Sequence, residues 1–133
     1  MKIKAFAATA ALLLVAGLSL AAMGDSTVIA TPLLVAQSAT SATAVPVGAA
    51  YMSRCRETAV YIQWSAGTSA GVVTVESADN QNYAGTWASL GTKTWSAASS
   101  EDLVQITGIH GAIRTRISTT ITGGTVSTFM LCN

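Results

Sequence analysis

The amino-acid sequence predicts one all-β domain: an antiparallel, jelly-roll-like β-sandwich of seven or eight short strands behind an apolar N-terminal helical segment. Two observations support this prediction. Beyond Gly24, apolar residues recur with the period of two that is typical of strands. The strand-like runs are separated by turn-forming residues at a spacing of roughly 8–12 residues, which is typical of sandwiches and small barrels. A chain of 133 residues is long enough for one two-layer core.

The composition limits the classes of function. Half of the residues are hydrophobic and 10% are charged, with a net charge of +1, which excludes a disordered chain. Lys2 and Lys4 lie at the extreme N-terminus, and the other basic residues are scattered: Arg54, Arg56, Lys93, Arg114 and Arg116. Phosphate backbones are bound by clustered Lys and Arg. Nucleic acid is therefore not an expected partner.

Residues 1–24 form the first expected region. They combine a basic start, an apolar stretch and small residues near Ala22, the pattern of a cleaved export signal. The apolar run is also about as long as a membrane anchor, so residues 5–22 are the part of the chain that would contact a membrane. The third alternative is a retained helix that packs against other subunits. In that case the expected inter-subunit contacts are Leu12, Leu13, Leu14, Leu18 and Leu20.

Residues 25–48 are expected to form an extended arm and linker. Residues 26–37 are rich in β-forming residues, but Pro32 cannot donate to a ladder and suits an edge or broken strand. Residues 38–44 are small and linker-like. Residues 45–48 read as a short strand and a turn.

Residues 49–133 are expected to be the sandwich itself. In residues 57–65, Val60, Ile62 and Trp64 fall on one face of a strand and are predicted to be core residues. Further strands are expected at residues 72–77, at 83–90 and 92–95 on either side of Gly91, and at 103–107.

Residues 112–122 give the most regular strand pattern. Ile113, Ile117 and Ile121 share the predicted core face, while Arg114 and Arg116 share the outward face with Ser and Thr residues. The following Gly-Gly pair is a hairpin signal, because glycine accepts the positive φ of primed turns. Residues 125–132 are therefore expected to return antiparallel beside this strand.

The ionisable residues do not form a recognisable catalytic, cofactor-binding or metal site. His110 is the single histidine, and nothing marks the Ser and carboxylate that a hydrolytic triad would add. Glu101 and Asp102 are adjacent, so in a strand they would point to opposite faces. Glu76 and Asp79 could offer oxygens to calcium, but the spacing lacks the Gly and Glu of an EF-hand loop. A non-enzymatic protein without cofactor or metal is predicted.

Three features leave alternatives open. Cys55 and Cys132 are either one bridge in an exported protein or two buried thiols in a chain assembled in the cytosol. Arg114 and Arg116 form either a solvated face or a rim that contacts an acidic neighbouring subunit. The Trp and Tyr side chains could line a sugar-binding face, but Trp64, on an inward face, has the position of an ordinary core residue.

Six short motifs follow one another between Pro32 and Asn133. They are Leu-Leu-x-Ala-Gln-x-Ala-Thr at residues 33–40, Val-Pro-Val-Gly at 45–48, a Gly/Ser/Thr/Ala turn with Val-x-Val-Glu at 67–77, Trp-x-x-Leu-Gly-Thr at 87–92, Ile-Arg-x-Arg-Ile at 113–117, and Gly-Gly-Thr-Val at 123–126. In this order they resemble a family of short proteins encoded near the capsid or tail genes of tailed bacteriophages.

The resemblance implies a virion structural protein, either capsid decoration (cement) or a head or tail fibre component. Its expected partners are other copies of itself, as a homo-oligomer, and neighbouring capsid or tail proteins. The signal-like residues 1–24 depart from the family. They keep open an exported bacterial β-sandwich, located in the periplasm or on the cell surface, that acts as an adhesin, a pilus-like subunit or a glycan-binding module.

Overall fold

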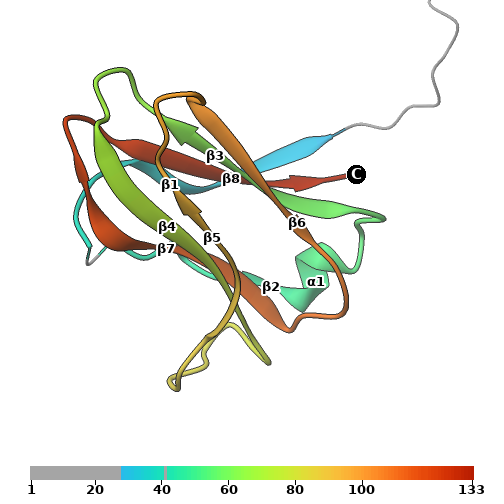
Figure 1. Cartoon of the computed structure of the whole chain (residues 1–133). Helices are drawn as coiled ribbons and strands as arrows, with labels where there is room; N and C mark the ends of the chain where they lie inside the picture. The colour runs from blue at the N-terminus through green and yellow to red at the C-terminus, as the bar shows by residue number, and fades with distance from the viewer. Residues whose placement is uncertain (1–27, 41) are drawn as a thin grey trace, which may run out of the picture.

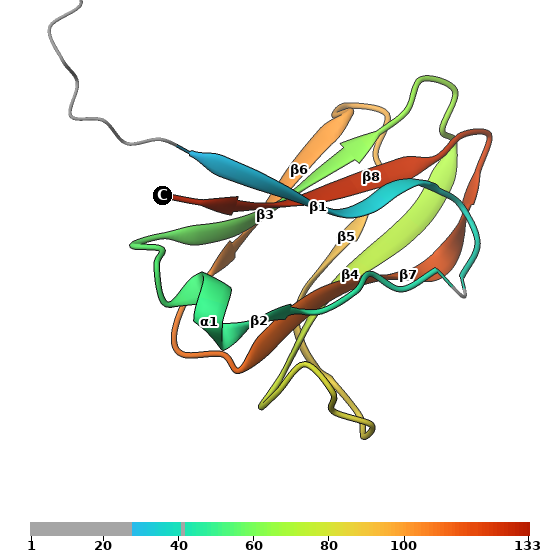
Figure 2. The ribbon, with the colours of Figure 1, turned by 180° about the vertical axis from the view of Figure 1, so that it is seen from behind.

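Eight strands form two four-stranded antiparallel sheets that face each other in this computed structural model, which describes residues 28–40 and 42–133 (Figures 1 and 2). Sheet A has the order β1 (Ile29–Gln37), β8 (Val126–Cys132), β3 (Thr58–Trp64), β6 (Glu101–Ile106). Sheet B has the order β2 (Val47–Gly48), β7 (Ala112–Thr122), β4 (Ala70–Ala78), β5 (Ala88–Thr94). The predicted antiparallel β-sandwich is confirmed.

All strand pairs within the sheets are antiparallel. β1 pairs with β8, β2 with β7, β3 with β6 and β4 with β5. The β8–β3 and β7–β4 pairs then complete the two sheets. Among the described residues the only α-helix is α1 (Ala49–Met52), a single turn between β2 and β3.

The core lies between the sheets, where the period of two places apolar side chains. The core residues predicted from β3 and β7 are all buried: Val60, Ile62, Trp64, Ile113, Ile117 and Ile121. Val73, Val75 and Val126 join the same cluster from β4 and β8. Fully burying a side chain of this kind contributes about 1.5–3 kcal/mol, so these strands hold the sandwich together mainly through their inward faces.

The expected hairpin at Gly123 and Gly124 is wrong. β7 belongs to sheet B and β8 to sheet A, so this turn carries the chain from one sheet to the other. Gly123 has a φ of +77°, and a Cβ there would collide with the carbonyl oxygen of Gly67 in the β3–β4 turn. That second turn also crosses between the sheets, and its Ser65 hydroxyl accepts a 2.8 Å hydrogen bond from the Thr125 amide. The Gly-Gly pair signalled a positive φ but not which strands would pair.

The arm and linker expected over residues 25–48 need correction for the part that the structure describes. β1 is an edge strand of sheet A, as Pro32 suggested, and its register with β8 shifts just after that residue. The amide of Ala44 donates a 2.8 Å hydrogen bond to the carbonyl of Thr115 on β7, and β2 continues along the same strand. The sandwich thus includes β1 and β2 and does not start at residue 49.

β5 and the N-terminal segment also differ from the expected elements or lie outside the described residues. β5 runs continuously through Gly91, where a break between two segments was expected, and residues 83–87 belong to the preceding loop. The N-terminal segment of residues 1–24 lies outside the described residues, and so do its leucines: Leu12, Leu13, Leu14, Leu18 and Leu20.

Candidate functional site

One buried carboxylate organises the outer face of sheet B. Glu76 on β4 lies opposite Arg114 on β7, and opposite charges at facing positions stabilise a strand pair. The Nε of Arg114 donates to Glu76 Oε2 at 2.8 Å, and the Nε of Arg116 donates to Oε1 at 2.9 Å. Glu76 is only 5% exposed. Both oxygens of one carboxylate are therefore used to hold two arginines on the same face.

An aromatic side chain lies beneath one of these arginines. The guanidinium carbon of Arg114 is 4.2 Å from the ring centroid of Trp87, which is a cation–π geometry. The indole N–H of Trp87 donates to the carbonyl of Tyr83 at 3.2 Å, and the two rings meet edge to face. Trp87 is buried. The loop before β5 is thereby anchored on the outer face of sheet B.

Hydroxyl groups continue this polar network along the sheet. The hydroxyl of Thr74 donates to Ser118 Oγ at 3.0 Å, and Ser118 in turn donates to the carbonyl of Val72 at 3.3 Å. Within the described part of the chain, every buried side-chain nitrogen or oxygen has a hydrogen-bond partner. The acidic partner of Arg114 and Arg116 in this structure is therefore Glu76 of the same chain.

The outer face of sheet A has the opposite character. Strand register places Pro32, Phe129, Tyr61 and Leu103 in one row across β1, β8, β3 and β6. The adjacent row runs Ala30, Leu131, Ala59, Gln105. The rings of Tyr61 and Phe129 lie 6.5 Å apart, and Leu103 is 49% exposed. We call these two rows, in which Gln105 is the one polar residue, the apolar rows of sheet A.

Polar side chains border the apolar rows at both ends of the sheet. On one side the next row contains Ser127, Gln63 and Glu101. A hydrogen bond to the Glu101 carboxylate, followed by partial burial, raises the pKa of Tyr61 above its ordinary value. On the other side Glu57 borders an apolar groove lined by Val28, Ala59, Leu103 and Leu131.

The candidate acid–base residues do not converge. Asp102 accepts a 3.0 Å hydrogen bond from the indole N–H of the core residue Trp64 and lies 3.7 Å from the ammonium of Lys93. Glu101, its neighbour, lies on the outer face beside Tyr61. The prediction that these two carboxylates point to opposite faces of a strand is confirmed.

The remaining polar candidates are also separated. His110 lies in the β6–β7 loop, with Nε2 2.9 Å from the carbonyl oxygen of Thr107. Glu76 lies on β4, where its carboxylate accepts from Arg114 and Arg116 of β7. Asp79 lies in the exposed loop that follows and accepts a hydrogen bond from Asn80. No group of three or more His, Cys, Asp or Glu side chains in the described residues is placed to hold a metal ion.

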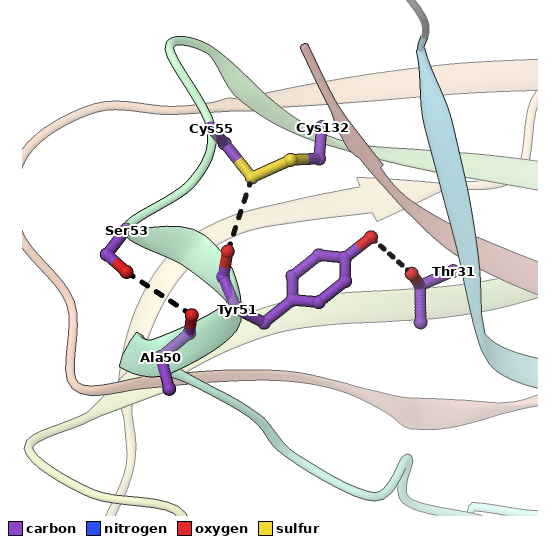
Figure 3. Close-up of a disulfide and its surroundings, with 6 residues drawn as sticks. All are labelled: Thr31, Ala50, Tyr51, Ser53, Cys55 and Cys132. Atoms are coloured by element: carbon purple, nitrogen blue, oxygen red, sulfur yellow. Dashed lines mark hydrogen bonds between the residues drawn. A yellow bond between two sulfur atoms is a disulfide. The ribbon is translucent and has the colours of Figure 1, made fainter.

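A disulfide joins Cys55, just after α1, to Cys132 at the end of β8, with their Cα atoms 5.1 Å apart (Figure 3). The hydroxyls of Tyr51 on α1 and Thr31 on β1 share a 2.5 Å hydrogen bond beside it. The Cys55 sulfur also contacts the Tyr51 carbonyl oxygen at 3.7 Å; a disulfide sulfur carries no hydrogen, so this is a contact only. Together these links fasten α1, β1 and β8 at one end of the sandwich.

The aromatic side chains do not share one face. Trp64 is in the core, Trp87 lies under Arg114 on sheet B, and Tyr61 is on the outer face of sheet A. Tyr51 points from α1 toward β1 (Figure 3), and Tyr83 lies in the loop before β5. The arrangement does not form the continuous ring platform that a sugar-binding face of these residues would require.

Sequence reasoning missed the two features that distinguish the outer faces. For Glu76, the available signal was a single carboxylate inside an apolar strand pattern, which in a sheet calls for a basic residue on the neighbouring strand. The apolar rows consist of alternate residues from four different strands. Recognising them requires the order in which those strands pair, which the sequence pattern does not give.

Comparisons with protein-family models, with curated proteins and with solved structures find no match to this chain. None of the helices in the described residues has the length and apolar character needed to cross a membrane.

Proposed function

We propose that this chain is a non-catalytic structural protein of a bacteriophage virion, either a capsid decoration protein or a component of a head or tail fibre. In this role it forms homo-oligomers and binds neighbouring virion proteins, without a cofactor. The order of motifs between Pro32 and Asn133, which resembles short phage proteins encoded beside capsid and tail genes, is the sequence support for the proposal.

The strand order is the structural observation that carries the proposal. β1 pairs with β8, β2 with β7, β3 with β6 and β4 with β5, so that the two strand numbers in each pair add up to nine. The β8–β3 and β7–β4 pairs then join these four pairs into two sheets. This is the order expected when one long hairpin of eight strands is folded over on itself, so it supports a jelly roll. Jelly rolls of two sheets are common in viral capsid and lectin domains.

Because a fold does not determine a function, the ionisable side chains also matter. Glu76 holds two arginines, Asp102 binds Trp64 and Lys93, and the two cysteines are joined to each other. Each of these groups is engaged in holding the sandwich together. Such engagement supports a structural role over a catalytic one.

Localisation in the source organism tests the proposal. An antibody raised against the full chain is expected to co-sediment with purified virus particles and to label them in immunogold electron microscopy. Mass spectrometry of the particles should find the chain in stoichiometric amounts relative to a capsid or tail protein. Label confined to the bacterial envelope, with particles free of the chain, would overturn the proposal.

The second candidate is an exported bacterial surface or periplasmic β-sandwich. The Cys55–Cys132 disulfide favours it, because disulfides persist in oxidising compartments, although virion surfaces also carry them. Intact-mass measurement of the native protein separates the candidates. Loss of about the first two dozen residues indicates export, whereas a retained start indicates assembly inside the host cell.

A further inference from the structure

The outer face of sheet A is organised like the surface of a protein interface. Its centre consists of the apolar rows, and its borders carry polar side chains such as Gln63, Ser127 and Glu101. An apolar centre with a polar rim is the common anatomy of interfaces. We propose that this face is a two-fold interface between two copies of the chain. The proposal deepens the proposed function, since it names the surface through which the chain would multimerise.

A two-fold axis running parallel to the strands, between β8 and β3, fits the register of the face. Across the interface, the partner's strands then follow one another in the reverse order. Each row of residues keeps its position along the strand direction. β6 of one copy then lies over β1 of the partner, and β3 lies over β8. Apolar rows of one copy consequently face the same apolar rows of the other.

The contacts made in this arrangement are complementary in size. Leu103 on β6 faces the partner's Pro32, and Tyr61 on β3 faces the partner's Phe129, which brings aromatic rings together. The small Ala59 faces the partner's Leu131. The apolar groove beside Ala59 provides the hollow that this leucine fills. Every contact occurs twice in the dimer, once in each direction across the axis, as an isologous interface requires.

Charge distribution selects this axis over the alternative. The acidic side chains at the border of the face, Glu57 and Glu101, belong to the β3–β6 half, while the outward residues of β1 and β8 carry no charged side chain. The axis parallel to the strands places each acidic half over an uncharged half. An axis across the strands would place the two acidic halves over each other, and like charges would then repel.

The size of the face is consistent with a specific dimer. Four strands spaced about 4.8 Å apart and six residue steps of about 3.3 Å give roughly 400 Å² of flat face per copy. Two faces together give about 800 Å² before the relief of the side chains is added. A stable biological interface buries at least about 1,000 Å², and smaller ones are weak, so the flat area of this face predicts a dimer of modest affinity.

Cross-linking of the full chain tests the axis. In one copy Pro32 and Leu103 lie on opposite edge strands of sheet A, about 14 Å apart, which is too far for a disulfide within one chain. In the proposed dimer the two positions face each other. The double variant P32C/L103C should therefore give a covalent dimer with a thiol cross-linker of about 10 Å, which spans two packed sheets but not the width of one sheet, and peptide mapping should confirm the intermolecular link. The single variants, P32C and L103C, should remain non-covalent.

Sedimentation equilibrium of the purified full chain tests the surface without new cysteines. Wild type should be dimeric at micromolar concentration, and Leu103→Glu should weaken dimerisation at least tenfold. Thr120→Glu, an exposed position on β7 of sheet B, is the matched control and should leave dimerisation unchanged. A monomeric wild type, or a dimer insensitive to Leu103→Glu, overturns the proposal.

Binding to particles distinguishes a failure of the interface from a failure of the proposed function. If wild type is monomeric but Leu103→Glu abolishes its attachment to particles, the face binds another virion protein and the two-fold proposal is wrong while the function stands. If wild type is a dimer sensitive to Leu103→Glu but is absent from particles, the interface stands and the virion role is wrong.

Discussion

On the outer face of sheet B, charged and hydroxyl side chains bind one another, whereas on the outer face of sheet A apolar side chains from four strands line up and remain partly exposed. Both faces belong to antiparallel sheets of four strands, so backbone architecture does not cause the difference. It arises from the outward residues alone. In a sandwich the outward side chains are not constrained by packing in the core. The residues on the outer face of one sheet can therefore differ in character from those on the outer face of the other.

The difference also separates two kinds of energetic contribution. The Glu76 network on sheet B acts within one chain and contributes to folding. On sheet A, Leu103 stays 49% exposed and Tyr61, Phe129 and Leu131 are half-buried, so these side chains keep apolar surface that can contribute to association. Variants on the two faces should consequently be detected by different measurements.

The largest expected effect follows from removing both arginines of sheet B. Arg114→Ala combined with Arg116→Ala leaves the buried carboxylate of Glu76 without its cations, so unfolding free energy should fall by about 3–5 kcal/mol. Urea denaturation measures the loss. Glu76→Ala is the control, and its loss should be smaller because the arginine side chains are 22% and 39% exposed and reach water. Equal losses would mean that Glu76 does not depend on the arginines.

The core beneath both faces should respond almost as strongly. Ile117→Ala deletes a fully buried side chain and leaves a cavity between the sheets, at a cost of about 3 kcal/mol. Thr120→Ala, on the outward face of the same strand, should change stability by less than about 0.5 kcal/mol. If both variants unfolded at the wild-type denaturant concentration, the assignment of faces on β7 would be wrong.

On sheet A, folding and association should separate. Leu103→Gln should change the unfolding free energy of the monomer by less than about 0.5 kcal/mol, as for most exposed substitutions, while weakening association. Unfolding must be measured at a protein concentration low enough to dissociate the dimer, because association adds to apparent stability. A large loss of monomer stability would show that Leu103 belongs to the fold and not to an interface.

The smallest effect concerns the titration of Tyr61. Its pKa in the folded chain is raised, mainly by the hydrogen bond to Glu101, above the ordinary value of about 10 that applies to the unfolded chain. The associated stability is therefore fully present below about pH 10 and is lost as pH rises through the folded pKa. The difference between the denaturation midpoints of wild type and Tyr61→Phe should stay constant from neutral pH to about pH 10 and shrink only as pH rises through the folded pKa. Parallel curves would contradict the interaction.

The sequence predicted those parts of the fold that depend on local pattern. The positions of β3 and β7 and their inward residues were recognisable because Val60, Ile62, Ile113 and Ile117 recur at strand spacing. Pro32 identified an edge strand because its missing N–H excludes it from the centre of a sheet. Such patterns are recognisable in a sequence because one face of the strand is buried and the other contacts solvent.

The parts that were not predicted depend on which strands pair. A Gly-Gly turn has the same requirement for positive φ whether it closes a hairpin or joins two sheets, so residues 123–124 could not reveal the crossover. The small residues of 38–44 carry no alternation, and Ala44 joins sheet B through its backbone amide. Glu76 contacts Arg114 because β4 pairs with β7, a strand that is distant from it in the sequence.

The disulfide has a mechanical consequence. Ile29, at the start of β1, pairs with Cys132 at the end of β8, and Cys132 is bonded to Cys55. A force that pulls the N-terminal side away from the sandwich therefore loads the β1–β8 ladder from one end. The backbone hydrogen bonds between the two strands then break sequentially, one residue pair after another. β8 cannot follow, because it is covalently held and also paired with β3. β1, with two register shifts and Ala36 at a φ of 47°, should detach first. The remaining seven strands would keep their cross-link, so that the tension would first withdraw Leu34, the side chain that β1 buries in the core, and would leave the other strands paired.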